Sequence, residues 1–180
     1  MNRLHRLAAL ALAAALALPH AALAAPGDSE CIWRNLQGDG LNAYLAAAES
    51  NSATPNPTDF ISIEQLSTAL DTCKIADKDV GAAGGAFGAF TQRKVAESAL
   101  LKSSGASPTV LDKAWKRIDP ALARQVGVAI AQSKFDPAAQ KQLEQAVAQF
   151  QADFTQPLEE KMAARYVLAR ADQEYLETLF

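Results

Sequence analysis

The chain has 180 residues, a formal net charge of −3 and two histidines, His5 and His20. This mildly acidic balance excludes a general nucleic-acid binder, which needs a basic surface. Both histidines lie in a segment that we expect to be removed, so the mature chain should lack imidazole chemistry such as Ser-His-Asp or Cys-His catalysis and histidine-ligated metals.

Residues 1–24 have the pattern of a secretory signal peptide. A basic start precedes an apolar run over residues 7–18, and an Ala-Leu-Ala motif ending at Ala24 supplies a small-residue cleavage site. The apolar run is shorter than the roughly 20 residues that a membrane span needs. We therefore expect a protein of the periplasm or the extracellular medium, with no membrane span after cleavage and a single helical domain over residues 25–180.

Helical patterns dominate the rest of the chain, and strand patterns are nearly absent. The first helical segment covers residues 29–50 and is interrupted at Gly38-Asp39-Gly40, because glycine raises the entropic cost of a helix. A proline-containing loop follows over residues 51–58. Ser62-Ile63-Glu64-Gln65 matches a capping box and predicts the start of the next helix, which carries Cys73 on its apolar face.

Cys31 and Cys73 are the only two cysteines, and 42 positions separate them. An oxidising compartment favours a disulfide between them. The chain-entropy model assigns about 4 kcal/mol of stabilisation to a loop of this length. A redox pair is the alternative, although the sequence has no Cys-x-x-Cys motif to tune it. We predict a structural disulfide that joins the first two helical segments.

Further helices follow in quick succession. A long helix is predicted from near Asp79 to Ser103, ended by Gly105. Three later helix starts are marked by a capping side chain directly before a proline, namely Ser107-Pro108, Asp119-Pro120 and Asp136-Pro137. Pro157 is predicted to open the last helix. The sequence thus predicts an all-α, single-domain bundle of six or seven helices with one disulfide.

The first half of the long helix is rich in glycine. Gly81, Gly84, Gly85 and Gly88 form two overlapping G-x-x-x-G spacings, a pattern that lets a second backbone approach a helix face. We predict close helix packing at these four residues, with membrane contact as the alternative. A phosphate-binding loop would need a lysine and a hydroxyl after the glycines, and neither follows in the required order.

Other candidate binding groups are weak. Asp77-Lys78-Asp79 lacks the glycine and glutamate that an EF-hand loop places at its sixth and twelfth positions, so we expect no metal and no cofactor. Trp33 and Trp115 lie on apolar helix faces. We expect both to pack in the core, with a ligand pocket between helices as the alternative.

If the mature chain has no histidine, carboxylates are the main groups that remain for acid–base catalysis. Glu97-Ser98, followed by Ser-Ser-Gly-Ala at residues 103–106, resembles the catalytic segment of lytic transglycosylases, which are helical periplasmic enzymes. The resemblance implies that Glu97 would act as a general acid with a raised pKa. It covers residues 97–106 alone, because the Gly-Leu-Met-Gln stretch of that family is absent from residues 107–110.

The sequence therefore favours a non-enzymatic role. We expect an exported helical protein of the bacterial cell envelope that binds another protein, a small apolar ligand or an envelope component. One alternative is a carboxylate-based envelope enzyme that uses Glu97. Another is a helical assembly or stress-protective module that acts through the glycine-rich face.

Overall fold

The computed structural model describes residues 28–36, 38–50, 55, 57–152, 154–156 and 158–180. These residues form eight α-helices, α2 to α9, with three short 3-10 helices and no strand. The predicted all-α fold is confirmed, with one helix more than expected because the segment over residues 29–50 forms two separate helices. The predicted signal peptide lies outside the described residues.

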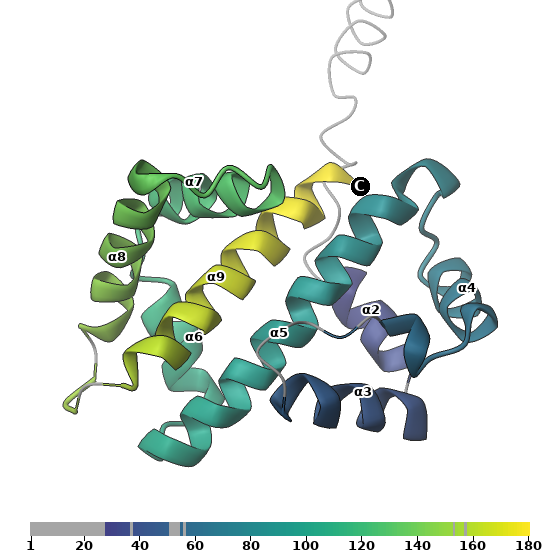
Figure 1. The fold of residues 1–180 in the computed structure, drawn as a ribbon, viewed down its shortest axis with the longest axis horizontal. Coiled ribbons are helices and arrows are strands. Elements are labelled where there is room, and N and C mark those ends of the chain that lie inside the picture. Colours follow the sequence, from purple (N-terminus) through teal and green to yellow (C-terminus); the bar gives the residue numbers. More distant parts are fainter. Residues whose placement is uncertain (1–27, 37, 51–54, 56, 153, 157) are drawn as a thin grey trace, which may run out of the picture.

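Three short helices make up the N-terminal part of the molecule (Figure 1), and they are α2 (Asp28–Asn35), α3 (Asp39–Ser50) and α4 (Ile63–Thr72). Gly38 separates the first two with a φ of +147°, a conformation that is open to glycine but not to residues with a Cβ. The predicted capping box begins α4. Ser62 Oγ accepts a hydrogen bond from the Gln65 N–H at 3.2 Å, and Gln65 Oε1 accepts one from the Ser62 N–H at 3.1 Å.

The longest helix is α5 (Val80–Ser104), which extends across the molecule. It ends at Gly105, whose φ of +65° places it in the left-handed region and whose N–H donates to the Leu101 carbonyl. The predicted length and end of this helix are therefore confirmed.

Four helices follow, and they are α6 (Pro108–Trp115), α7 (Pro120–Ala131), α8 (Pro137–Gln151) and α9 (Glu160–Leu176). Ser107, Asp119 and Asp136 each cap the helix that follows by accepting a backbone N–H in the first turn, so the three predicted starts are confirmed. The last helix begins at Glu160 and not at Pro157, which lies outside the described residues.

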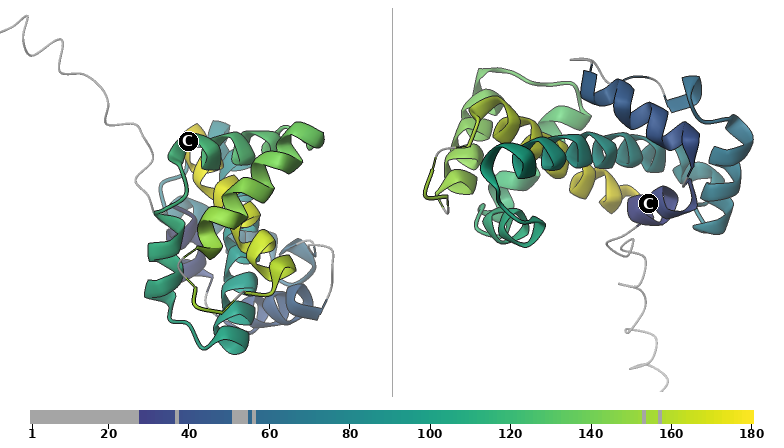
Figure 2. Two further views of the ribbon diagram at one scale, coloured as in Figure 1. Left: turned by 90° about the vertical axis from the view of Figure 1, so that its left-hand side faces the viewer. Right: turned by 90° about the horizontal axis from the view of Figure 1, so that it is seen from below.

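The centre of the molecule is the antiparallel pair of α5 and α9 (Figures 1 and 2). Gly85 near the start of α5 faces Leu176 at the end of α9, whereas Arg165 near the start of α9 bonds to Gln92 further along α5. α7 and α8 pack against α9, α2 packs against α5, and α4 packs against α2. Within the described part of the chain, no helix is long and apolar enough to cross a membrane.

Two sets of buried side chains stabilise this arrangement, and α5 contributes to both. The N-terminal cluster consists of Ile32, Leu36, Leu41, Tyr44, Ile61, Ala69, Ala83 and Phe87. The C-terminal cluster comprises Ala96, Leu100, Leu111, Ala114, Trp115, Ile118, Leu122, Ala123, Val126, Ala146, Val147, Phe150, Leu158, Ala163, Tyr166, Val167 and Ala171. Trp115 is thus a core residue as expected, and the partly buried Trp33 packs against Phe90 with their ring centroids 5.3 Å apart.

Candidate functional site

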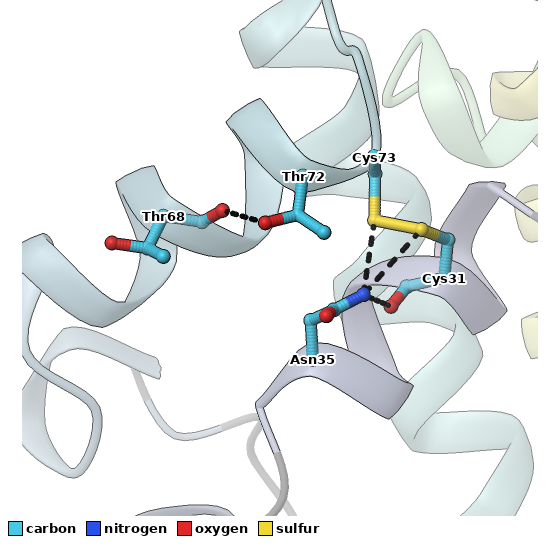
Figure 3. Close-up of a disulfide and its surroundings, with 5 residues drawn as sticks. All are labelled: Cys31, Asn35, Thr68, Thr72 and Cys73. Carbon is cyan, nitrogen blue, oxygen red and sulfur yellow. Dashed lines mark hydrogen bonds between the residues drawn. A yellow bond between two sulfur atoms is a disulfide. The ribbon is translucent and has the colours of Figure 1, made fainter.

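The predicted disulfide joins Cys31 of α2 to Cys73 at the end of α4 (Figure 3). The two Cα atoms are 5.8 Å apart. Asn35 lies over the bridge, where its Nδ2 donates to the Cys31 carbonyl at 2.9 Å and lies 3.6 and 3.7 Å from the two sulfurs. The bridge therefore links two helices that are distant in sequence, as its position in the sequence predicts.

The four glycines of α5 for which close helix packing is predicted differ in how near their neighbours lie. A Cβ added at Gly81, Gly84 or Gly88 would meet no other part of the described structure within 4 Å. At Gly85 it would meet only a side-chain atom, Leu176 Cδ1, at 3.2 Å. Gly81, Gly84 and Gly88 therefore have room for a side chain, whereas Gly85 is in close contact with α9.

At Gly40 of α3 an added Cβ would lie 2.5 Å from the Phe60 carbonyl oxygen, and a second close backbone approach occurs at Gly127 of α7. A Cβ there would lie 2.9 Å from the carbonyl carbon of Ala171 and would overlap its oxygen. Sequence reasoning missed this residue, and the signal that could have found it is a lone glycine within a helical pattern. Glycine at this position lets α7 cross α9 in direct backbone contact.

The open space beside the α5 glycines is a pocket of about 460 Å³, which we call the α5–α9 pocket. Its volume lies in the range of small-molecule sites. α5 and α9 each contribute four residues, at positions i, i+3, i+4 and i+7 of one helix face. The end of α7 and the loop after it form a third wall of the pocket. The lining residues are Gly85, Gly88, Ala89, Gln92, Ile130, Phe135, Arg165, Leu168, Ala169 and Asp172.

Phe135 is placed at this pocket by a tight turn after α7. Ser133 adopts a left-handed φ of +52°, and the Lys134 N–H donates to the Ala129 carbonyl at 2.8 Å, which closes the helix end. Asp136 then caps α8. The Phe135 ring therefore lies between two fixed helix ends, yet 46% of the residue is exposed.

Asp172 is the unusual polar group of the pocket. Its Oδ1 is buried and has no hydrogen-bond partner in the described structure. Burial raises the pKa of this carboxyl from 3.8 to about 6, and no neighbouring charge or hydrogen bond lowers it again. A carboxyl whose pKa is perturbed by burial at the wall of a pocket is typical of a functional site.

The other end of the pocket holds a guanidinium that has partners. Arg165 donates to Gln92 Oε1 and, at 3.3 Å, to the Ala48 carbonyl. Because a guanidinium can only donate hydrogen bonds, the Gln92 amide must turn its oxygen, and not its nitrogen, toward Arg165. Gln92 Nε2 is then left as a second buried polar atom without a partner in the described structure.

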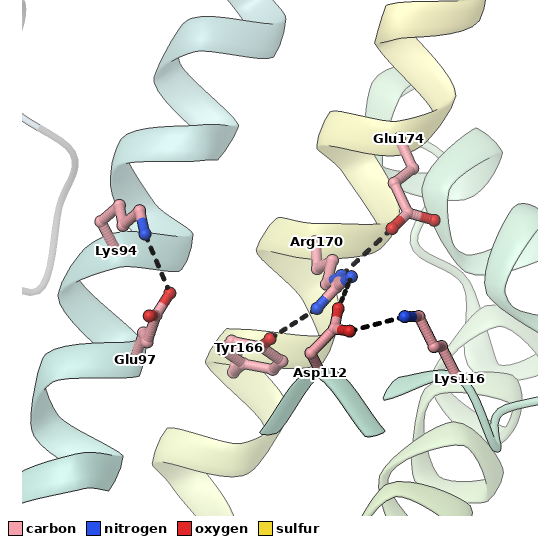
Figure 4. Close-up of polar contacts among 7 residues, drawn as sticks. All are labelled: Lys94, Glu97, Asp112, Lys116, Tyr166, Arg170 and Glu174. Carbon is pink, nitrogen blue, oxygen red and sulfur yellow. Dashed lines mark hydrogen bonds and ion pairs between the residues drawn. The ribbon is translucent and has the colours of Figure 1, made fainter. Parts of the chain in front are cut away.

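A second cavity, of about 350 Å³, lies beside Trp115, and its charged lining residues are Lys116, Arg124 and Glu174. Lys116 pairs with Asp112 at 2.8 Å, and Glu174 with Arg170 at 3.1 Å. Arg170 also bonds to Asp112 at 2.7 Å, so these two ion pairs form one network (Figure 4). Two of the charged groups of this cavity, Lys116 and Glu174, therefore already have partners within the protein.

The Arg170 network is structural. The Arg170 side chain is only 11% exposed and lies over the Trp115 ring, 5.0 Å from its centroid. It donates to the Tyr166 hydroxyl at 2.8 Å. Hydrogen bonds from Lys116 and Arg170 hold the pKa of Asp112 below its usual value. The network connects α6 to α9.

Glu97 lies outside the α5–α9 pocket, on the surface of α5. It pairs with Lys94 at 3.4 Å (Figure 4) beside a shallow depression that Ser98 also lines. The hydroxyls of Ser103 and Ser104, which carry the resemblance to lytic transglycosylases, both donate to the Leu100 carbonyl of their own helix. The two serine hydroxyls thus serve as hydrogen-bond donors to a carbonyl near the end of α5, and Glu97 already has a cationic partner.

An apolar groove of about 530 Å³ lies between α4 and α5, and we call it the α4–α5 groove. Ile63 and Leu66 line it, and Asp71 lies on its wall. Ile63 is 76% exposed, so the groove is open to solvent.

The described residues contain no group of three or more His, Cys, Asp or Glu side chains that could hold a metal ion. The α5–α9 pocket is therefore the candidate site, because an apolar lining and an unpartnered carboxyl meet there. Comparison with protein-family models, with curated proteins and with solved structures finds no match for this chain.

Proposed function

We propose that this chain is an exported, non-enzymatic binding protein of the bacterial cell envelope that takes a small apolar ligand into the α5–α9 pocket. The observation that carries the proposal is a pocket of about 460 Å³ that combines an apolar lining with the unpartnered carboxyl of Asp172. Binding sites for small molecules typically have this composition, with few polar groups on an apolar wall.

Export is supported by the composition of residues 1–24 and by the disulfide, since disulfides persist in oxidising compartments. Expression of the full chain in a bacterium tests it. We expect the periplasmic fraction to contain a protein that begins at Ala25 and has no reactive thiol. Recovery of the uncleaved chain from the cytoplasm, with two reactive thiols, would contradict export.

Binding is tested with a neutral apolar dye, N-phenyl-1-naphthylamine, titrated into the mature protein. Gly88→Leu places a side chain in the pocket, where an added Cβ meets no neighbour. Gly81→Leu is the matched control, because Gly81 lies on the same helix with equally open surroundings but does not line the pocket. We expect one saturable site in the wild type and the control, and loss of that site in Gly88→Leu.

Circular dichroism and thermal melting of both variants show whether the fold is retained. Equal dye binding by folded Gly88→Leu and wild-type protein would remove the α5–α9 pocket as the site, and with it the proposed function.

The second candidate is a carboxylate-based enzyme in which Asp172, and not Glu97, is the acid. The pKa of about 6 favours it, because a general acid works best with a pKa near the working pH. Mass spectrometry of a bound ligand after incubation separates the two candidates. A binding protein returns the ligand unchanged, whereas an enzyme releases a product of different mass, and Asp172→Asn would stop its formation.

A further inference from the structure

We propose that the ligand of the α5–α9 pocket is a small organic cation, an apolar molecule whose protonated amine pairs with the carboxylate of Asp172. This inference rests on the proposed function, because it names the chemical class that the same pocket takes.

The carboxyl of Asp172 lacks a partner among the described residues. A buried carboxylate without a hydrogen-bond donor is costly, and an ammonium group would supply both a donor and the opposite charge. Asp172 Oδ1 has no such donor in the described structure, and no charged neighbour lowers the pKa of the group. The positive charge that would balance the Asp172 carboxylate must therefore come from a molecule that enters the pocket.

Arg165, the cation that lines the pocket, does not take this role. It lies seven positions before Asp172 on α9, which corresponds to about 10 Å along the helix axis. Its guanidinium points to Gln92 and the Ala48 carbonyl. The two charged ends of the pocket are thus separate, and the end at Asp172 lacks a cation.

The space between the two ends of the pocket suits an apolar body. Glycine and alanine at four lining positions leave the hollow, and Leu168, Ile130 and Phe135 provide apolar walls. An apolar body of roughly the length between Arg165 and Asp172, about 10 Å, would replace water along these walls. An anionic head group at Asp172 would instead place two like charges together.

Three probes that share an eight-carbon chain test the class: n-octylamine, n-octanol and octanoate, each measured by calorimetry at pH 8, where Asp172 is ionised. We expect octylamine to bind about tenfold more tightly than octanol, because a hydrogen bond to a charged group adds about that factor. Octanoate should bind most weakly. Asp172→Asn should lower the affinity for octylamine about tenfold and leave octanol binding unchanged.

Asp71→Asn is the matched control, because Asp71 is an exposed carboxylate beside the apolar α4–α5 groove. It should leave all three affinities unchanged, and Gly88→Leu should abolish binding of all three probes.

The cation proposal is overturned if octanol binds but octylamine binds no more tightly, or if Asp172→Asn leaves the affinity for octylamine unchanged. It is also overturned if Asp71→Asn, and not Asp172→Asn, weakens the amine. In each of these cases the pocket can still bind an apolar ligand, so the proposed function stands. Failure of the neutral dye, octanol and octylamine to bind at all would overturn the proposed function itself.

Discussion

The two halves of this molecule are stabilised in different ways. The N-terminal cluster is the smaller set of buried side chains among the described residues, and its helices α2 and α4 are joined by the Cys31–Cys73 disulfide. The C-terminal cluster is larger and combines close packing at Gly127 with the Arg170 network. Small cores commonly depend on covalent links, and the comparison places that dependence in one half of a chain that shares a single central helix.

Removal of the disulfide should have the largest effect. We expect the double variant Cys31→Ala, Cys73→Ala to lose about 4 kcal/mol of free energy of unfolding, because the unfolded chain is no longer constrained. Urea denaturation measures the loss. Hydrogen exchange should locate it in α2 to α4, with protection in α6 to α9 changed less. An equal loss of protection in both halves would contradict the difference between them.

Gly127→Ala tests the close packing of the other half. The added Cβ would overlap the Ala171 carbonyl and lie 2.9 Å from Tyr175 Cβ, so we expect a loss of about 3 kcal/mol in the free energy of unfolding. Gly84→Ala is the matched control. Its Cβ would meet no neighbour within 4 Å, so it should stabilise the protein by about 0.5 kcal/mol through helix propensity. Equal effects of the two changes in urea denaturation would refute the contact at Gly127.

Arg170→Met tests the polar part of the C-terminal half. Its loss leaves Tyr166 and Asp112 without their shared donor, and Asp112 keeps only Lys116. We expect a cost of about 2 kcal/mol, below the usual value for a buried pair because Asp112 is partly exposed. Lys94→Met breaks a single, longer ion pair on α5, with Glu97 at 3.4 Å, and should cost about 0.5 kcal/mol or less. The difference between their denaturation midpoints is the measurement.

Asp172→Asn should have the smallest effect, and its sign depends on pH. The folded-state pKa of about 6 exceeds the value of 3.8 expected when the chain is unfolded, so the fold favours the protonated carboxyl. The wild type therefore loses stability as the pH rises from about 4 through 6. The variant lacks this loss and should exceed the wild type by about 1 kcal/mol at pH 8, after discounting for solvent exposure.

Thermal melting of both proteins at pH 4 and pH 8 measures the change. A constant difference between them at the two pH values would show that Asp172 is not desolvated.

Most of the helices could be predicted because their ends are encoded locally. The capping side chains of Ser62, Ser107 and Asp136, and the left-handed Gly105, act within one turn of the helix that they begin or end. The disulfide could also be predicted, since two cysteines allow only one intramolecular pairing.

The site could not be predicted, because it depends on contacts between distant segments. A strip of glycines has the same spacing whether a second helix presses against it or stands away from it. Only the pairing of α5 with α9 decides between these outcomes, and it leaves a pocket at Gly88 and Asp172. The link between Asp112 and Arg170, 58 positions apart, likewise has no local signal.

The position of α9 has a consequence for the order in which the chain can fold. This helix is the last α-helix of the sequence, yet it lies between α5, α7 and α8 at the centre of the C-terminal half. If the exported chain emerges N-terminus first, the buried residues of the N-terminal cluster are all present once Phe87 has crossed the membrane, whereas the C-terminal cluster must wait for residues up to Ala171. The later helices therefore keep their apolar faces exposed until α9 arrives, and a chain that stops before α9 would lack the helix against which α5, α7 and α8 pack.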